Sequence, residues 1–236
     1  MLTPFTRFLL PGDMRVFAIL AVILLSMPFW LPLIGGYTDL AIRIAIFAIF
    51  ALGFDILLGF TGYLSFGHAA FFGVSAYATA LTFQHFSLNI IPAMLVGVSC
   101  SVILAIVLGL ITLRRSGIYF SILTLAFAEM MYRLAYSVLT GVTGGENGLR
   151  VSGVPHLFGM EMHGLPAFYV CVILLLVLYA LVKRMSTSQV GLMLRAIKSN
   201  QTRLEYAGAN LFYYKILAFV LSAAFAGLAG SLLVAT

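Results

Sequence analysis

Long apolar blocks, separated by short polar segments, make up most of the chain. A block of about 17–25 apolar residues can cross the hydrocarbon core of a bilayer as one α-helix. Read in order, the blocks predict about seven membrane-spanning helices, at residues 16–34, 40–59, 63–83, 90–113, 117–140, 167–182 and 215–235. The pattern therefore predicts an all-α fold, a polytopic membrane helical bundle, in one transmembrane domain over residues 1–236.

The positions of lysine and arginine predict the topology of this bundle. These residues gather before the first predicted span, after the fourth, and between the sixth and seventh, at Arg7, Arg15, Arg114, Arg115, Lys183, Arg184, Arg195, Lys198, Arg203 and Lys215. Basic connections lie on the cytoplasmic side of a membrane. Seven crossings from a cytoplasmic N-terminus place all three clusters in the cytoplasm, whereas losing one span would move a cluster outside.

Composition agrees with a membrane protein. The chain is 63% hydrophobic and 8% charged, while a typical soluble domain is about 25% charged. The net charge of +6 is a topology signal, and its sparse basic residues give no support for nucleic-acid binding. The cysteines, Cys100 and Cys171, sit inside apolar blocks and are interpreted as buried small hydrophobic residues, so no disulfide or metal site is expected.

The third predicted span carries a stripe of small residues. Gly62, Ser65, Ala69, Gly73, Ala76 and Ala80 follow one another at spacings of 3, 4, 4, 3 and 4, which is one face of an α-helix. Small faces let membrane helices pack closely, so Ala69, Gly73, Ala76 and Ala80, together with Gly227 and Gly230 in the last span, are predicted to mediate helix packing. Alternatively, Gly59 and Gly62 loosen the helix start, which then points its N–H groups at an anionic group in a cavity.

Two ionisable residues fall inside predicted spans. Such groups usually face the bundle interior or a water-filled path. His68 is therefore interpreted either as an interhelical hydrogen-bonding group or as a residue of a pathway. Glu129 lies near or just past mid-membrane and four residues before Arg133, the favourable order for a helical ion pair. The pair is interpreted as structural or as a polar patch on the path, with Tyr119 and Thr124 lining the same path or packing.

The connection between the fifth and sixth spans contains the glycine-rich stretch 140–149. Its paired glycines are turn signals. They do not open a phosphate-binding loop, because no G-K-[ST] follows, and the predicted topology places this connection outside. No motif for ATP binding is found in the chain.

Residues 183–215 are the most polar part of the chain and are predicted to be cytoplasmic. Leu194, Ile197, Leu204 and Ala207 fall on one helical half, and charged residues fall on the other. This predicts an amphipathic segment, built of two short helices joined at Ser199–Asn200 and stopped at Gly208. It is interpreted as lying on anionic lipid, as a solvated connector, or as docking its apolar face into a partner.

Four ordered motifs resemble one protein family. They are "GYLSFGHAAFFGVSAYATA", "RSGIYFSILTLAFAEM", "TGGENGL" and "LRAIKSNQTRLEYAGANLFYYKILAFVLSAAFAGLAGSL". Together they resemble the permease subunits of branched-chain amino acid ABC importers, and more closely the M-type of the two paired permeases. The resemblance covers the chain from about residue 40 to its end.

The resemblance implies a non-enzymatic permease of the bacterial inner membrane that moves a hydrophobic amino acid inward by alternating access. It implies four kinds of partner: a second permease subunit, two cytoplasmic ATPases that carry ATP and Mg, a periplasmic substrate-binding protein, and the lipid membrane. It further implies a coupling helix within roughly 191–210, with Arg195, Ala196, Lys198, Glu205 and Gly208 in that role. The substrate pathway is then expected at Gly62, Ser65, Gly67, His68, Tyr119, Thr124 and Glu129.

Three departures from the family pattern leave alternatives open. Tyr63 stands where the family often has glutamine, and Asp55 stands where a neutral polar residue is more usual, so permeases for urea, amides or sugars remain alternatives. Family members also continue beyond the last span into further helices, which favours a truncated chain. An ion-coupled secondary carrier is the alternative from another class, although the chain shows no inverted repeat of the kind such carriers often have.

Overall fold

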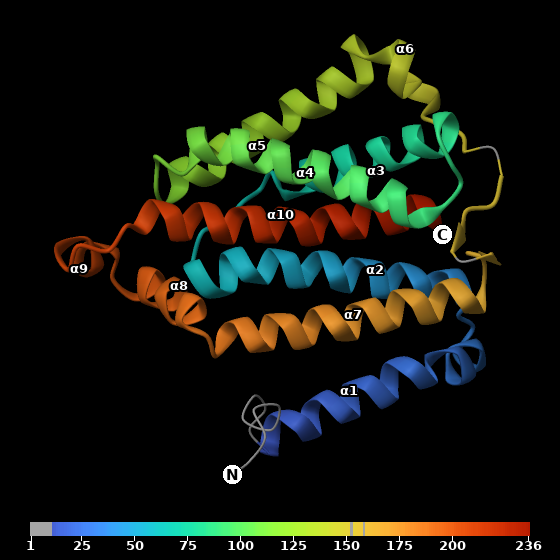
Figure 1. The fold of residues 1–236 in the computed structure, drawn as a ribbon, viewed down its shortest axis with the longest axis horizontal. Helices are drawn as coiled ribbons and strands as arrows, with labels where there is room; N and C mark the ends of the chain where they lie inside the picture. Colours follow the sequence, from blue (N-terminus) through green and yellow to red (C-terminus); the bar gives the residue numbers. More distant parts are fainter. Residues whose placement is uncertain (1–10, 152, 158) are drawn as a thin grey trace.

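The computed structural model describes residues 11–151, 153–157 and 159–236. One long helix lies in each of the seven predicted spans (Figure 1). These helices are α1 (Pro11–Trp30), α2 (Thr38–Asp55), α3 (His68–His85), α4 (Ile90–Thr112), α5 (Ile118–Arg133), α7 (Leu165–Ser186) and α10 (Leu211–Ala235). The long α-helices form a bundle in which neighbouring helices run roughly side by side.

Short elements join and extend these helices. Two are π-helical turns that continue a long helix, one is a small antiparallel hairpin, and the others are single turns or short helices. They are η1 (Pro32–Ile34), η2 (Ile56–Thr61, π), η3 (Leu134–Val138, π), α6 (Thr140–Thr143), η4 (Gly145–Asn147), β1 (His156–Leu157), β2 (Met160–Glu161), α8 (Gln189–Ser199) and α9 (Gln201–Tyr206).

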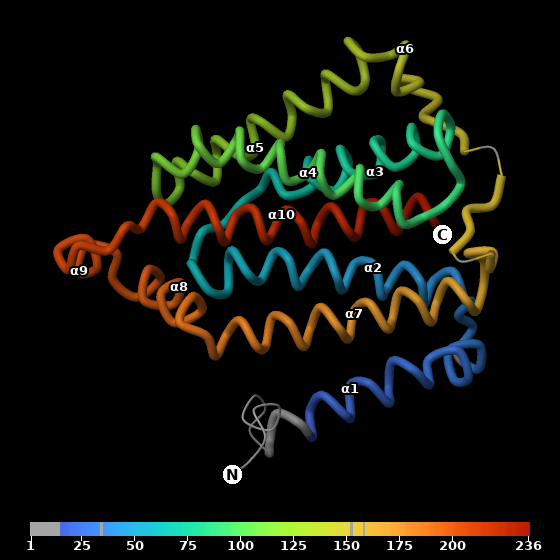
Figure 2. Tube along the Cα trace, viewed as in Figure 1, coloured from blue at the N-terminus to red at the C-terminus, as the bar shows by residue number. Residues whose placement is uncertain are grey.

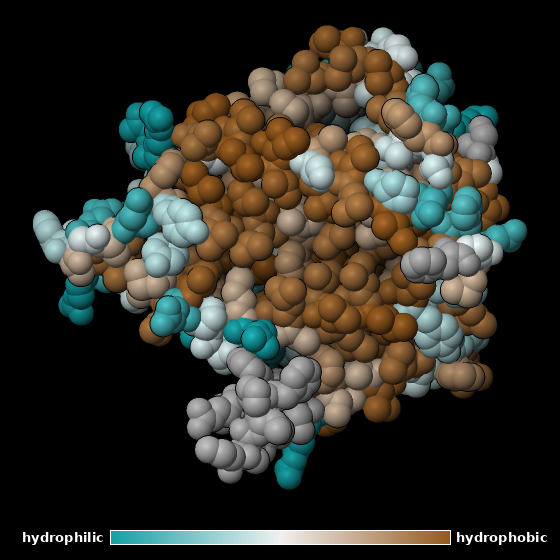
Figure 3. All heavy atoms as spheres, viewed as in Figure 1, coloured by the Kyte–Doolittle hydropathy of each residue, from teal (hydrophilic) through white to brown (hydrophobic). Residues whose placement is uncertain are grey.

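Five helical segments in the described residues are long and apolar enough to cross a membrane: Thr38–Thr61, Ile90–Thr112, Ile118–Val138, Leu165–Ser186 and Leu211–Ala235. Figure 3 shows a broad hydrophobic band across the middle of the molecule with hydrophilic residues at both ends. Arg15–Trp30 is a shorter apolar helix. The polar residues of α3, including His68, Gln84 and His85, reduce its mean hydropathy. A multi-pass bundle is therefore supported, and seven crossings remain a prediction.

The basic connections of the described chain meet at one end of the bundle. Figure 1 places α8, α9 and the α4–α5 connection, which carries Arg114 and Arg115, at the same end. The α6 region and the hairpin lie at the opposite end. This arrangement is the one that the charge pattern predicts. The side of the membrane on which the N-terminus lies stays a prediction.

Helix α10 is the centre of the packing. It contacts α2, α3 and α4, and its buried residues include many small ones: Ala218, Ser222, Ala223, Ala226, Gly227, Ala229, Gly230 and Ser231. A Cβ atom built on Gly230 would overlap the backbone of Phe72 in α3, and one built on Gly227 would crowd Ser101 in α4. Small residues on α10 therefore set how closely the neighbouring helices approach.

Buried hydroxyl groups join α10 to α3 and α4. The Ser75 hydroxyl lies 2.6 Å from the Gly227 carbonyl oxygen and 2.7 Å from the Ser231 hydroxyl, and Thr79 donates to Ser231 at 2.9 Å. A Cβ atom on Gly97 of α4 would overlap all three of these side-chain oxygens. A buried hydroxyl is costly without a hydrogen-bond partner. Because Gly97 has no side chain, there is room for these three hydroxyl groups to lie close together and form hydrogen bonds.

The packing face of α3 corrects the prediction made from its small-residue stripe. Residues 62–67 are not helical, so Gly62 and Ser65 do not belong to the helix. Within α3, Ala69 is exposed, Ala76 is half-buried, and a Cβ atom on Gly73 would meet nothing within 4 Å; only Ala80 is buried. Within this chain α3 instead packs through His68, Phe71, Ser75, Thr79 and Thr82.

The physical reason is that hydroxyl groups can replace small apolar residues at a helix contact. The residues at 68, 71, 75, 79 and 82 have the same helical spacing as the predicted stripe but are displaced around the helix. Ser75 and Thr79 find partners on α10, so their face is buried although it is more polar. The stripe of Ala69, Gly73 and Ala76 is left on a different side of α3.

The same substitution at two helical glycines tests this assignment. We expect Gly97→Ala to lower the free energy of unfolding by about 1–3 kcal/mol, because the added methyl group overlaps the buried hydroxyl cluster. Gly73→Ala should leave stability unchanged or raise it slightly, since alanine favours the helix. Thermal unfolding of the purified permease in detergent measures both. Equal stability of the two variants would contradict the assigned packing face.

Candidate functional site

The connection between α2 and α3 is a break in the helical backbone that crosses the bundle (Figure 2). The π-helical η2 ends at Thr61 and is followed by Gly62, whose positive φ of 78° is a conformation that glycine adopts readily. Residues 63–67 then continue without helix until α3 begins. The Ser121 hydroxyl of α5 donates to the Leu64 carbonyl at 2.6 Å, and Gly67 packs against the backbone of Thr124. The break is thus held by α5.

His68 lies buried at the start of α3, with 3% of its surface exposed. Its Nε2 lies 2.9 Å from the Ser222 hydroxyl of α10, and that hydroxyl donates to the Gly53 carbonyl of α2. Because the Ser222 proton is committed to Gly53, Nε2 of His68 is the donor to Ser222. The rings of Phe50, Phe54 and Phe71 pack around the imidazole. The interhelical hydrogen bond is therefore present, and it ties three helices together.

Two buried polar atoms near this point have no hydrogen-bond partner among the described residues. They are the Ser65 hydroxyl and Nδ1 of His68. Since Nε2 donates to Ser222, Nδ1 of the neutral ring is an acceptor. Buried polar atoms almost always have a hydrogen-bond partner. These two unpaired atoms therefore make the beginning of α3 a polar site within an apolar interior.

Helix α8 packs by its apolar face on η2, with further contacts to α7 and α10. Leu194 and Ile197 are buried, while Arg195 and Lys198 are exposed. The Lys198 ammonium donates to the Gly59 carbonyl of η2 at 3.0 Å, and the Arg195 guanidinium donates to the Ser186 carbonyl at 2.7 Å. The predicted amphipathic segment is therefore confirmed.

The predicted junction between α8 and α9 is also confirmed. α8 ends at Ser199, and the side chain of Asn200 accepts from the Arg203 N–H at 2.9 Å, which caps α9. Gly208 follows α9 with a positive φ of 80°, which stops the helix. Of the predicted apolar residues in α9 and after it, Leu204 is half-buried but Ala207 is exposed, which corrects that part of the pattern. The short helix α9 packs less against the rest of the chain than α8 does.

Tyr63 connects the α2–α3 break to α9. Its hydroxyl donates to Oε1 of Gln201 at 3.0 Å, and Nε2 of Gln201 donates to Glu205 at 3.2 Å. The Lys215 ammonium of α10 lies 5.2 Å from the centre of the Tyr63 ring, within the range of a cation–π contact. Sequence analysis identified Tyr63 only as a departure from a family pattern. The contact joins residues 138 positions apart, and no local sequence pattern signals it.

A cavity of about 450 Å³ opens beside this contact. It lies between the α2–α3 break, the α4–α5 connection and the α8–α9 junction, lined in part by Gly62, Tyr63, Ser116, Lys198 and Gln201. Gly62 is thus placed beside the side chain of Lys198. Two residues that the sequence assigned to different roles, pathway and coupling, meet at this cavity.

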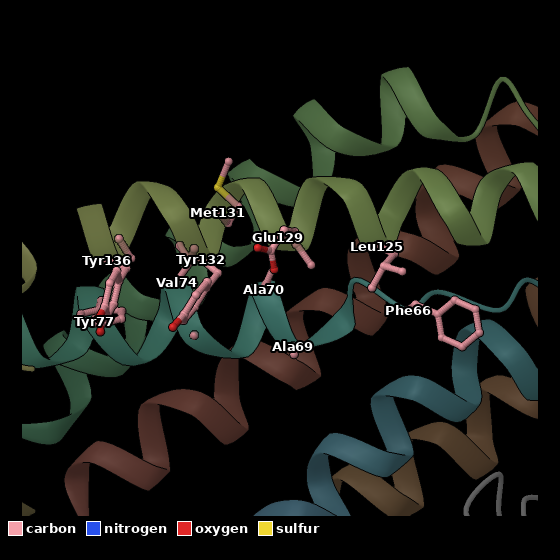
Figure 4. Close-up of a pocket in the computed structure, with 13 residues that line it drawn as sticks. Phe66, Ala69, Ala70, Val74, Tyr77, Leu125, Glu129, Met131, Tyr132 and Tyr136 are labelled. Atoms are coloured by element: carbon pink, nitrogen blue, oxygen red, sulfur yellow. The ribbon is translucent and has the colours of Figure 1, made fainter. Parts of the chain in front are cut away.

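A second cavity, of about 400 Å³, forms a groove between α3 and α5 (Figure 4). Ala69, Gly73 and Tyr77 line it from α3, and Leu125 and Glu129 line it from α5. Figure 4 shows the Glu129 carboxylate between the two helices, near Ala70. Glu129 accepts from Nε of Arg133 at 2.9 Å, so the predicted ion pair is present, although Arg133 itself is not among the residues that line the groove.

The predicted pathway residues fall in four places and do not form one site; one place is the 450 Å³ cavity, where Gly62 lies. His68 and Ser65 are buried near the start of α3, where Gly67 meets Thr124. Glu129 lines the α3–α5 groove. Tyr119 is 76% exposed on the first turns of α5 and lines neither the groove nor the 450 Å³ cavity.

Metal binding has no support in the described residues, which contain no group of three or more His, Cys, Asp or Glu side chains able to hold an ion. Both cysteines are free thiols in the structure, Cys171 buried and Cys100 half-buried. The polar groups identified above are hydrogen-bond donors and acceptors and one ion pair. Such an arrangement can bind and guide a solute.

Removing the hydroxyl of Ser222 tests the interhelical bond of His68. We expect Ser222→Ala to lower the free energy of unfolding by about 1–3 kcal/mol, because it leaves Nε2 of His68 buried without its partner and removes the hydrogen bond to the Gly53 carbonyl. Ser26→Ala is the matched control, because among the described residues that hydroxyl donates to the Ile23 carbonyl of its own helix and to no other helix. Denaturation in detergent compares the two. A Ser222→Ala variant as stable as the control would contradict the role given to this bond.

The chain is similar to known transport proteins over most of its length. Residues 36–236 match the family described as branched-chain amino acid transport system / permease component. The high-affinity branched-chain amino acid transport system permease protein LivM of Salmonella typhimurium (strain LT2) is 30% identical over 240 residues, which cover 92% of this chain and 56% of the relative. LivM of Escherichia coli (strain K12) is 28% identical over 260 residues, covering 97% and 60%. No solved structure matches the chain significantly.

The chain spans between half and two thirds of the length of these curated relatives. The family match begins just before α2 and continues through α10, so it includes the α2–α3 break, the α3–α5 groove and the α8–α9 segment. On this match over most of its length, the chain belongs to the permease component family of branched-chain amino acid transport systems.

Proposed function

We propose that the chain is a permease subunit of an ABC importer for branched-chain, hydrophobic amino acids. In this proposal it pairs with a second permease subunit, receives substrate from a periplasmic binding protein, and moves it inward by alternating access. Two cytoplasmic ATPases hydrolyse ATP, and the chain itself performs no covalent chemistry. The names of both relatives specify branched-chain amino acid transport, which supports this substrate class over urea, amides or sugars.

The main observation that supports the proposal is that α8 and α9 pack against the α2–α3 break. The apolar face of α8 is buried within this chain, through Leu194 and Ile197. Its opposite face carries Arg195, Lys198 and the exposed side chain of Leu192. This corrects the predicted docking by the apolar face: the face left for an ATPase is the polar one. Ala196 is half-buried between the two faces.

The contacts of this segment supply a route for motion. A displacement of α9 pulls on Tyr63 through Gln201, and a displacement of α8 pulls on η2 through Lys198 and the Gly59 carbonyl. Both contacts end on the α2–α3 break, which is followed by His68. Residues Glu205 and Gly208 are exposed, so they remain available to a partner. We propose that ATPase closure is transmitted to the bundle by this route.

Competition for uptake tests the proposed substrate class. The permease is reconstituted with the second permease, the ATPases and the binding protein of the proposed transporter, and uptake of labelled leucine is measured. We expect an excess of unlabelled leucine, isoleucine or valine to suppress uptake and an excess of urea to leave it unchanged. ATP-independent uptake by this chain alone would instead support a secondary carrier, and competition by urea would contradict the amino acid assignment.

The conservative variant Tyr63→Phe tests the proposed route of coupling. It removes the hydroxyl that donates to Gln201 but keeps the ring beneath Lys215. We expect uptake per ATP hydrolysed to fall about two- to tenfold, the factor that corresponds to a hydrogen bond of about 0.5–1.5 kcal/mol. Tyr206→Phe is the matched control, because Tyr206 lies on the same α9 and is 88% exposed. Unchanged coupling in Tyr63→Phe, at normal abundance, would remove Tyr63 from the route.

A further inference from the structure

We propose that the α3–α5 groove is a binding site for a free amino acid zwitterion. In this site Glu129, which lines the groove, takes the ammonium group of the ligand, and the apolar groove takes its aliphatic side chain. Arg133 is not one of the lining residues, but its ion pair with Glu129 holds it next to them, and from there it takes the carboxylate of the ligand. The inference rests on the proposed function, because it assigns residues to the substrate of that transporter. Three features support this site: the location of the ion pair, the shape of the groove, and the match between the charges of the pair and those of the ligand.

The Glu129–Arg133 ion pair is exposed on a helix that could span a membrane. Segment Ile118–Val138 is long and apolar enough to span a membrane. Yet the side chains of Arg133 and Glu129 are 76% and 55% exposed on it. Ionisable side chains within membrane spans rarely face lipid, and they mark water-filled paths or contacts within an assembly. This side of α5 therefore faces a polar route or another protein in the membrane.

The groove has the size and lining of a small-molecule site. Its volume of about 400 Å³ lies within the range of about 300–1,000 Å³ that is typical for ligand pockets. Ala69 and Gly73 line the α3 side, and the space around Gly73 is open for 4 Å. Leu125 and Ala128 line the α5 side. These apolar walls suit a branched aliphatic side chain, and Glu129 is the one carboxylate among the lining residues.

The charges of the pair complement those of a zwitterion. The bond to Glu129 uses Nε of Arg133 and Oε1 of the carboxylate. The terminal nitrogens of the guanidinium can therefore bind a carboxylate as a two-pronged donor. The second oxygen of Glu129 can accept from an ammonium group. An amino acid bound in this way adds one negative and one positive group to a pair that is already neutral, so the site gains no net charge inside the membrane.

The backbone of α5 changes its geometry directly after Arg133. The π-helical η3, Leu134–Val138, begins at the next residue, and none of its residues is buried. π-Helical turns are uncommon and frequently mark functional sites. A turn of this kind changes the direction in which the following side chains point, and it places Tyr136 on the groove. It is an observation independent of the ion pair.

A helix of the second permease subunit is the competing occupant of the groove. It would have to bury the Glu129–Arg133 pair, and the cost of removing both charges from water often exceeds their mutual attraction. A zwitterion supplies partners for both charges and fits a cavity of about 400 Å³. The observations therefore favour the amino acid, and coverage by the partner becomes an outcome of the test.

The test maps the groove with a photoreactive leucine that carries a diazirine on its side chain. The intact transporter is reconstituted with its partners, irradiated with this analogue, digested and analysed by mass spectrometry. We expect labelled peptides from segments 66–77 and 125–136. Excess leucine should suppress the label, while 4-methylpentanoate, which lacks the ammonium group, and leucinamide, which lacks the carboxylate, should not.

Two neutral variants with matched controls complete the experiment. Glu129→Gln and Arg133→Gln should each reduce labelling of the groove about tenfold, as expected for the loss of a charge-assisted hydrogen bond. Glu161→Gln and Arg114→Gln, which neutralise exposed charges outside the groove, should not reduce it. Abundance and capture of the second permease are measured for all four. If a variant fails to assemble, the label map and the competition in the wild-type transporter decide.

The outcomes separate this inference from the proposed function. Wild-type leucine uptake with labels only outside the groove, or with labelling unchanged in assembled Glu129→Gln and Arg133→Gln, would overturn the site while leaving the importer intact. Cross-linking of the groove to the second permease, with no leucine-sensitive label, would assign it to subunit contact. A complete absence of leucine uptake in the wild-type complex would contradict the proposed function, and the site with it.

Discussion

The close approach of α10 to its neighbours is the constraint on which the rest of the bundle depends. Helices in lipid gain little from the hydrophobic effect, so they associate through tight packing and hydrogen bonds. Here glycines at 97, 227 and 230 let the backbones approach, and the hydroxyl groups of Ser75, Thr79 and Ser231 satisfy one another in the space left. The positions of α3 and α4 against α10 follow from this contact.

The α2–α3 break is the point where this rigid centre meets the parts proposed to move. On one side, His68 is fixed to α10 and α2 through Ser222. On the other, Tyr63 reaches Gln201 of α9, and the Gly59 carbonyl accepts from Lys198 of α8. A non-helical stretch between two fixed ends can change its backbone angles more easily than a helix can. This location suits a segment that converts movement of α8 and α9 into movement within the bundle.

The candidate site was predictable where its geometry is local. The Glu129–Arg133 pair spans one helical turn, and the division of α8 from α9 at Asn200 follows from a cap residue, so both were read from spacing. The bond of His68 to Ser222 joins residues 154 positions apart. The groove between α3 and α5 likewise requires two helices to be placed side by side. Neither feature has a local signature, and the small-residue stripe was accordingly assigned to packing when part of it lines the groove.

The sequence by itself determined the class of the protein, the position of its long helices and the clustering of basic residues at one end, because these depend on hydropathy, helix length and charge summed over neighbouring residues. Only the tertiary structure decided which face of each helix is buried. Serine and threonine can pack as closely as alanine once a partner accepts their proton, and that partner lies on another helix. The buried face of α3 was therefore fixed by the hydroxyl groups and glycines of α4 and α10, which no pattern within α3 could reveal.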